Sequence, residues 1–429
     1  MVALPFCIPE KRVKLLGILA SPWRGRGLSD AAIDAALRRP IGWGKPGRAV
    51  EERVRPGESV CLVVSDQTRQ TAADRVLPVL WRRLARRGVK ASDGFVLVAT
   101  GIHRPPDAAE LRRILGADMQ ALFAGRIFCH DPDAADLVAV GRTRRGHEVR
   151  LNRRAVEADR LILIGSAAYH YHAGFGGGRK ALVPGLADRA TIAHTHSLTL
   201  DPRRDRIRPG VGIGRLAGNA VAGALLEAAR LRPPDFIINT VLAPDGRLAG
   251  VFAGELDRAH RAACRLAARV ARAEIAERAD LVVADAGHVE TWIQAHKALF
   301  NASRAVRARG RIVLLAPCRE GLGNERFRYW ITRPTLPALY RGLRRSPEVN
   351  GQTALSTRQR GARAILVTRL PARDRRDLGL RCAPTPAAAI GAALDDLGRA
   401  GIRRPTCYVM PEAIAVVPFA VRRRARGAP

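Results

Sequence analysis

Short apolar runs alternate with segments of helical periodicity along most of the chain. The run at 61–65 follows a Pro-Gly turn and is predicted to be a buried strand, and the run at 95–100 is predicted to be the next one. Between them, apolar residues recur every three or four positions over 73–87, and Gly88 is the expected end of that helix. A strand, a helix and a second strand in this order are typical of a parallel sheet.

The same alternation continues towards the C-terminus. A helix is predicted over 107–116 and a strand over 160–165, and residues 236–255 predict two strands joined at Pro-Asp-Gly, which is typical of a hairpin. A long helix rich in alanine and arginine is expected over 256–278. After it the pattern restarts, with strands predicted at 281–287, 311–316, 364–368 and 406–410 and helices near 290–308 and 386–399.

The restart of the pattern predicts a domain boundary near residue 275. We therefore expect an α/β protein with two α/β domains and mainly parallel sheets. The first domain is predicted over 1–275 and the second over 276–407. The tail, 408–429, is a candidate to return to the first domain and complete it.

Composition narrows the class of protein. The chain of 429 residues is 47% hydrophobic, which is enough for a core and excludes overall disorder. Its 73 basic and 39 acidic residues give a net charge of +34, but the basic residues are spread from Arg12 to Arg426 and aromatic residues make up only 5%. A binding surface for nucleic acid is therefore not expected.

The cysteines and the N-terminal sequence bear on the compartment. The seven cysteines contain no CxxC pair, which argues against a disulfide framework. The sequence has no apolar run of about 18 residues and no signal-peptide pattern at its start. These features predict a cytoplasmic protein without a membrane span.

Titratable side chains gather where three predicted strands end. Asp66 and Arg69 follow the first strand, His103 follows the second, and four of the ten histidines lie between 170 and 196, after the strand at 160–165. Each feature alone has a structural explanation, such as a helix cap for Asp66 or a turn residue for His103. Because the carboxyl ends of parallel strands meet at one edge, where open α/β sheets bind ligands, the set predicts a single site.

The histidine-rich segment also contains a glycine-rich turn followed by a lysine. Four glycines between 174 and 178 would let the backbone approach a ligand closely, although the spacing of a phosphate-binding P-loop is absent. Lys180 is one of only six lysines, which indicates that a nucleophilic amine is needed there. Gln294 and Lys297 are expected on one face of the helix near 290–308, where a solvated face is the plain alternative.

These segments resemble the nickel-pincer lactate racemase family, which also includes other 2-hydroxyacid racemases and epimerases. The resemblance covers most of the first domain and reaches the second. It rests on the sequences V-S-D-Q-T-R at 64–69, A-T-G-I-H-R at 99–104, N-R-R-A-V-E-A-D-R-L-I-L-I-G at 152–165, H-Y-H-A-G-F-G-G-G-R-K-A-L-V-P-G at 170–185, T-I-A-H-T-H-S at 191–197 and Q-A-H-K at 294–297.

The resemblance implies a nickel-pincer nucleotide as cofactor, in which a pyridinium nucleotide with two thiocarboxylate arms holds nickel. In that family a lysine is joined to one arm as a thioamide and a histidine is the fourth nickel ligand; the matching positions are Lys180 and His196. The two acid/base histidines of the family match His103 and His170. The remaining matches are Asp66, Gly177 and Gly178 for cofactor binding, and Arg69, Gln294 and Lys297 for substrate binding.

The implied activity is racemisation or epimerisation of a 2-hydroxyacid by hydride transfer to and from the tethered cofactor. Hydride abstraction leaves a planar 2-oxoacid that can take hydride back on either face, while two histidines exchange the hydroxyl proton. The resemblance also implies that residues 1–275 bind the cofactor, that 276–407 contribute to substrate binding across an interdomain cleft, and that cofactor-synthesis proteins mature the enzyme.

Three positions depart from the family pattern. Gln70 stands where proline is common, Gly176 where serine is frequent, and Ile293 where lactate-acting members often carry an aromatic residue. The last difference bears on the substrate, so lactate in particular is not predicted.

Other interpretations of the same residues stay open. His170, His172, His194 and His196 could serve a zinc hydrolase, which uses three protein ligands and an open water position. The arginine content could serve a non-enzymatic binder of nucleic acid or anionic surfaces. The same fold and cofactor could also run a one-way dehydrogenation.

Overall fold

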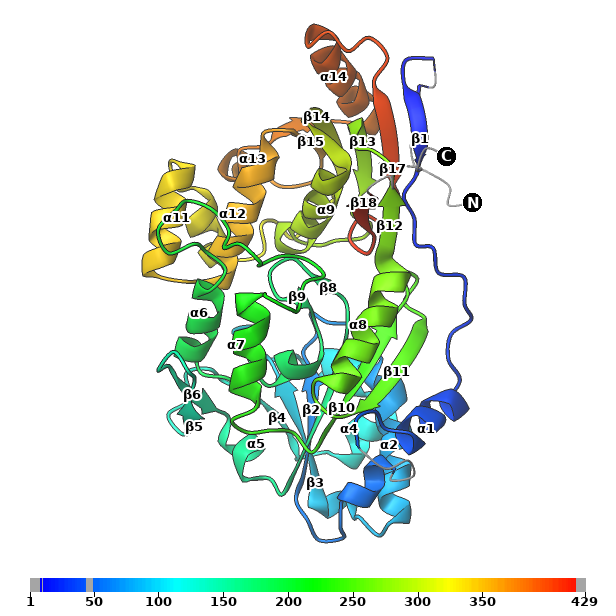
Figure 1. The fold of residues 1–429 in the computed structure, drawn as a ribbon, viewed down its shortest axis with the longest axis vertical. Helices are drawn as coiled ribbons and strands as arrows, with labels where there is room; N and C mark the ends of the chain where they lie inside the picture. Colours follow the sequence, from blue (N-terminus) through cyan, green and yellow to red (C-terminus); the bar gives the residue numbers. More distant parts are fainter. Residues whose placement is uncertain (1–7, 10, 44–48, 422–429) are drawn as a thin grey trace, which may run out of the picture. The chain divides into compact units, whose positions relative to one another are not determined.

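The computed structural model describes residues 8, 9, 11–43 and 49–421, and the chain forms two compact units (Figure 1). One unit spans 24–270, and the other combines the residues up to 23 with those from 271 onwards. This division lies close to the predicted boundary near 275. No helix within the described ranges is long and apolar enough to cross a membrane.

A six-stranded sheet with the order β11-β10-β7-β2-β3-β4 forms the centre of the unit at 24–270. All neighbouring strands run parallel except β10 and β11, which form the predicted hairpin. The strands are β2 (Val60–Ser65), β3 (Gly94–Ala99), β4 (Ile127–Cys129), β7 (Arg160–Ser166), β10 (Phe236–Leu242) and β11 (Leu248–Gly254).

Helices bury their apolar faces against this sheet. In α2 (Ala73–Arg86), Val76, Leu80 and Leu84 have no exposed surface and share one core with the strand residues Leu62 and Val96. The other helices of the unit are α1 (Asp30–Arg38), α3 (Ala108–Leu115), α4 (Ala117–Leu122), α5 (Arg153–Glu157), α6 (Arg189–Ser197), α7 (Ala220–Ala229) and α8 (Arg258–Ala271). A small hairpin of β5 (Val138–Arg142) and β6 (Glu148–Leu151) was not predicted.

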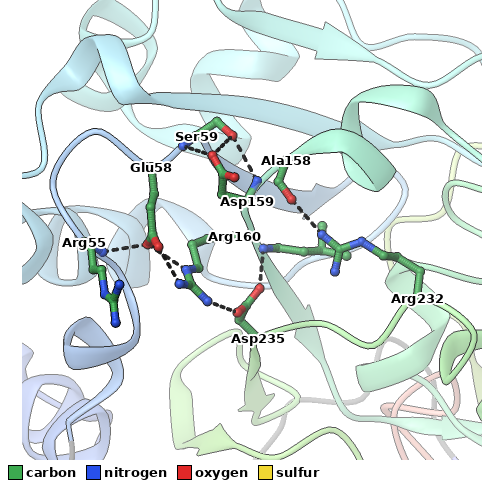
Figure 2. A network of polar contacts seen from close by, with 9 residues as sticks. Arg55, Glu58, Ser59, Ala158, Asp159, Arg160, Arg232 and Asp235 are labelled. Atoms are coloured by element: carbon green, nitrogen blue, oxygen red, sulfur yellow. Dashed lines mark hydrogen bonds and ion pairs between the residues drawn. The ribbon is translucent and has the colours of Figure 1, made fainter.

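Ion pairs fix the edge of the sheet at which the parallel strands begin (Figure 2). Arg160, the first residue of β7, donates to Glu58 at 2.7 Å and to Asp235 at 2.9 Å. Asp159 accepts hydrogen bonds from the backbone and hydroxyl of Ser59. These contacts join the starts of β2, β7 and β10. A ligand site is therefore expected at the opposite edge, where the parallel strands end.

The second unit has its own six-stranded sheet, with the order β1-β17-β13-β14-β15-β16 and all neighbours parallel. Its strands are β1 (Lys14–Ile18), β13 (Ala279–Asp285), β14 (Val306–Leu315), β15 (Ala364–Val367), β16 (Arg381–Ala383) and β17 (Thr406–Met410). The helices are α9 (Trp292–Ala305), α10 (Glu325–Ile331), α11 (Leu336–Arg345), α12 (Val349–Gly361), α13 (Ala372–Leu378) and α14 (Pro386–Arg399).

Both ends of the chain differ from the prediction. The described N-terminal strand β1 pairs with β17, so it belongs to the second sheet rather than to the first domain. The tail does not return to the unit at 24–270 either: β18 (Val417–Ala420) pairs in parallel with β12 (Arg272–Ile275), and both strands belong to the second unit. Residues 422–429 of the predicted tail lie outside the described residues.

The predicted helix over 256–278 is too long. Helix α8 ends at Ala271, and residues 272–275 form β12. Along β12, Ala273 and Ile275 are buried while Arg272 and Glu274 are exposed, and this alternation suits a strand with one packed face. The pairing with β18 satisfies the backbone groups that the helix would otherwise have used.

Candidate functional site

The first part of the site is a carboxylate–imidazole pair after β2 and β3. Asp66 Oδ2 lies 2.5 Å from His103 Nδ1, and Asp66 Oδ1 accepts from the Thr68 hydroxyl at 2.6 Å and the Thr68 backbone N–H at 3.1 Å. Asp66 is buried, whereas the His103 side chain is 39% exposed. A carboxylate on Nδ1 fixes the ring and leaves Nε2 to exchange a proton with a ligand.

Hydrogen bonding decides the charge of Asp66. Burial alone would raise the pKa of this carboxyl group, but the hydrogen bond and charge of His103, with the Thr68 hydroxyl, outweigh it and hold the pKa below its ordinary value. Asp66 is therefore ionised at neutral pH and holds a negative charge against His103 Nδ1.

The second part of the site follows β7. A short hairpin of β8 (Tyr169–His170) and β9 (Gly174–Phe175) leads into the one-turn 3-10 helix η3 (Gly178–Ala181), which carries Lys180. Lys180 Nζ lies 3.4 Å from His170 Nε2. His170 Nδ1 accepts the backbone N–H groups of His172 at 3.2 Å and Ala173 at 3.0 Å. The neutral ring therefore carries its proton on Nε2, facing the lysine amine.

Burial and nearby cations lower the pKa values of both groups. Burial lowers the pKa of Lys180 to about 7, with smaller contributions from the charges of Arg69 and Arg179. Burial, followed by the charge of Lys180, moves the pKa of His170 well below its ordinary value. A large share of Lys180 is thus a neutral, nucleophilic amine at neutral pH.

The third part of the site is His196 on α6. Its Nδ1 donates to the Ile192 carbonyl one turn earlier, at 2.7 Å, so that Nε2 carries the lone pair that a metal can bind. Burial lowers the pKa of His196 to about 4, against the opposing effect of the Ile192 bond, and the charge of Lys180 adds to the lowering. The electrostatic interactions of His196 with Lys180 and His170 place the three residues in one cluster.

The glycines of the turn serve its packing. Gly177 and Gly178 have φ values of 73° and 54°, which side chains disfavour. A Cβ on Gly177 would lie 2.7 Å from Asn239 Oδ1, and one on Gly178 would lie 2.8 Å from the His260 ring. Glycine is therefore required for the turn to contact β10 and α8, and the predicted cofactor contact of these two residues stays a prediction.

The predicted substrate residues fall in both units. Arg69 is exposed and donates to the carbonyl and hydroxyl oxygens of Thr68 at 3.1 and 3.2 Å. Gln294 and Lys297 lie one turn apart on α9, as their spacing predicts; Gln294 is exposed and accepts the Glu290 backbone N–H at 3.1 Å. Both belong to the second unit, and their role in substrate binding stays a prediction.

The histidines do not assemble a zinc site. His194 stacks on His147 with ring centroids 4.2 Å apart and an interplanar angle of 3°. Across the described ranges, no three His, Cys, Asp or Glu side chains are placed to hold a metal ion. A zinc hydrolase needs three protein ligands, so this interpretation has no support in the described residues.

Sequence reasoning missed three residues that shape the site. Thr68 lies within a quoted motif but was assigned no role, and Asn239 and His260 lie on a strand and a helix that looked ordinary. Their contribution depends on contacts with the glycine-rich turn, which the sequence does not reveal.

Comparison with known proteins identifies the family. Residues 5–207 match the family model described as the lactate racemase N-terminal domain. Over 313 residues the chain is 31% identical to a lactate racemase from Lactiplantibacillus plantarum, which covers 72% of this chain and 70% of that protein. The chain belongs to the lactate racemase family. A lactate racemase from Thermoanaerobacterium thermosaccharolyticum is 26% identical over 332 residues, covering 76% of this chain and 75% of that one.

Solved structures confirm the α/β fold with two main sheets. The lactate racemase apoprotein from Thermoanaerobacterium thermosaccharolyticum matches with a TM-score of 0.83 at 23% identity, over 97% of each chain. A protein from Thermotoga maritima matches with a TM-score of 0.66 at 17% identity, over 93% of this chain and 100% of that one. Most of the predicted site residues lie within the segment that matches the lactate racemase family model.

Proposed function

We propose that this member of the lactate racemase family is a 2-hydroxyacid racemase or epimerase that works with a nickel-pincer nucleotide tethered to Lys180. One observation carries the proposal: the half-buried Lys180 amine lies 3.4 Å from His170 and interacts electrostatically with His196. A neutral amine suits a covalent tether, and a neutral imidazole suits a metal ligand.

The charge of the site fits such a cofactor. A nucleotide phosphate and thiocarboxylate arms are anionic, and the cations Arg69 and Arg179 act electrostatically on Lys180. His196, whose Nε2 lone pair is free of the Ile192 bond, would hold the nickel of such a cofactor beside the cofactor's own sulfur donors. When bound, the cofactor would supply a centre that accepts the hydride of the substrate Cα and returns it to either face.

The side chains of the chain supply the proton chemistry. His103 Nε2, with Asp66 on Nδ1, would hold or release the hydroxyl proton of one enantiomer, and His170 would do so for the other. The exposed guanidinium of Arg69 would bind the substrate carboxylate and keep the central carbon in place. Gln294 and Lys297 on α9 are further proposed substrate-binding residues.

The test is mass spectrometry of the intact protein with metal analysis, on protein made in a host that assembles the cofactor. We expect an adduct on the peptide that contains Lys180, together with bound nickel, and neither in Lys180→Ala. A panel of 2-hydroxyacids deuterated at Cα then identifies the substrate by chiral chromatography. Retention of deuterium in the product supports hydride transfer, whereas an unmodified Lys180 with zinc or no metal contradicts the proposal.

A further inference from the structure

Two buried polar side chains hold the turn that carries Lys180. Asn239 on β10 and His260 on α8 are both fully buried, with 0% of their surface exposed. Asn239 Oδ1 accepts the Gly178 backbone N–H at 2.7 Å, and His260 Nε2 lies 2.8 Å from the Gly176 carbonyl oxygen, to which it donates. The two bonds therefore hold the backbone on both sides of Gly177.

Close packing reinforces the two hydrogen bonds. The Asn239 amide and the His260 ring occupy the space that side chains at Gly177 and Gly178 would need. The next residue, Arg179, is buried and lies 3.5 Å from Asp257, which directly precedes α8. Consecutive positions of the turn are thus fixed to β10 and α8, up to the residue before Lys180.

The stability of the fold alone does not account for an asparagine at position 239. Its Nδ2 is buried, and no acceptor for it exists among the described residues. A buried amide without a partner destabilises a fold, so the benefit must come from the acceptor oxygen that Asn239 presents to Gly178. His260 is neutral because burial lowers its pKa to about 4, so it donates to Gly176 without adding a charge next to Arg179.

We propose that Asn239 and His260 are positioning residues for Lys180: acting through the backbone of residues 176–178, they fix the amine in the place where the cofactor is attached. Attachment needs the amine at a defined position, and a loose turn would spread it over many. The role of Lys180 as the tether rests on the proposed function. The fixing of the turn by Asn239 and His260 does not depend on that function.

Hydrogen exchange in the cofactor-free protein tests whether Asn239 and His260 fix the backbone of the turn. Asn239→Ala removes the acceptor, and His260→Phe keeps a ring of similar size but removes the donor. We expect exchange in the peptide covering 176–182 to become about fivefold faster or more in both variants, with α2 and β2 unchanged. The control is Asn301→Ala, which removes a buried amide bonded to Ala413 and Ile414 in the second unit.

The outcome decides each residue separately. A wild-type exchange rate in this peptide overturns the role of the residue that was changed. Asn239→Ala could speed exchange throughout the unit at 24–270. In that case His260→Phe, which leaves the packing nearly intact, decides whether these side chains fix the turn.

Cofactor loading tests the positioning role. In the host that assembles the cofactor, we expect the fraction of chains with an adduct on Lys180 to fall about fivefold or more in Asn239→Ala. Asn239→Asp keeps the acceptor oxygen and should recover at least half of the wild-type loading, and Asn301→Ala should load fully. Wild-type loading in Asn239→Ala overturns the positioning role. A wild-type protein without an adduct on Lys180 instead contradicts the proposed function. The hydrogen-exchange measurement then still tests whether Asn239 and His260 fix the turn.

Discussion

The two proposed acid/base histidines have opposite electrostatic surroundings. His103 is partly exposed and lies against the negative charge of the ionised Asp66. His170 is buried beside Lys180, and both burial and the lysine charge oppose its protonation. A protonated His170 is therefore compatible only with a neutral or covalently bound Lys180. Attachment of a cofactor to Lys180 would remove that charge, but a protonated ring would also have to turn away from the backbone N–H groups of His172 and Ala173.

Amine labelling checks the state of Lys180. In the cofactor-free protein we expect acetylation of Lys180 to follow a pH midpoint of about 7, because only the neutral amine reacts and burial lowers its pKa to that value. The reactive fraction rises as the pH rises through 7 and falls below it. Peptide mapping compares Lys180 with the exposed Lys90 in the same sample. A midpoint of Lys180 near 10 would contradict the expectation.

Asp66→Asn tests the carboxylate behind His103. The amide keeps the shape but loses the negative charge and an acceptor oxygen that orient the ring through Nδ1, so we expect kcat to fall roughly 100-fold with little change in KM. The adduct on Lys180, measured on the intact protein, must stay at the wild-type level for the comparison to hold. An unchanged kcat in the loaded variant would mean that His103 works without its carboxylate.

At the scale of elements, the two edges of the sheet at 24–270 differ in function: the strand starts are joined for stability, and the strand ends carry the candidate site. Ion pairs join the starts of β2, β7 and β10 (Figure 2), whereas histidines, a lysine and a glycine-rich turn follow the ends of β3 and β7. Changes at the first edge should therefore alter stability without altering the chemistry.

Arg160→Met tests this division. Loss of the guanidinium removes the bonded cation from Glu58 and Asp235, whose side chains are only 19% and 14% exposed. We expect urea unfolding to show a loss of about 2–4 kcal/mol, with loading of Lys180 unchanged. Arg153→Met is the matched control, because its partners Glu157 and Asp136 are exposed and the loss should be clearly smaller. Equal losses in the two variants would refute the division.

The sequence predicts those elements whose signal is local. The strands near Asp66 and His103 follow from apolar runs between turns, and the rule that parallel strands end at one edge brings these residues together with the segment that carries Lys180. The pairing of β1 with β17 joins Lys14 to Thr406, far apart in the sequence, and no periodicity encodes it. The contacts of Asn239 and His260 were hidden for the same reason, since an ordinary strand and helix become partners of the turn only after folding.

At the scale of the whole molecule, the net charge of +34 is the feature that the fold and the site do not account for. Many arginines are used in ion pairs, such as those of Arg160 and Arg328, but 39 acidic residues cannot neutralise 73 basic ones. An excess of this size creates a positive potential around the protein at low salt. The proposed substrate is an anion, so its encounter with the protein should be accelerated.

Salt dependence of the kinetics tests whether the excess charge acts on the substrate. Between about 20 and 500 mM salt we expect kcat/KM to fall roughly three- to tenfold while kcat stays constant, because salt screens long-range attraction and leaves the buried cluster nearly unaffected. Chloride and gluconate at equal ionic strength should act alike, since screening does not depend on the anion. A larger effect of chloride would indicate competition at the carboxylate site near Arg69 instead. A flat profile would mean that the excess charge reflects composition and has no part in substrate capture.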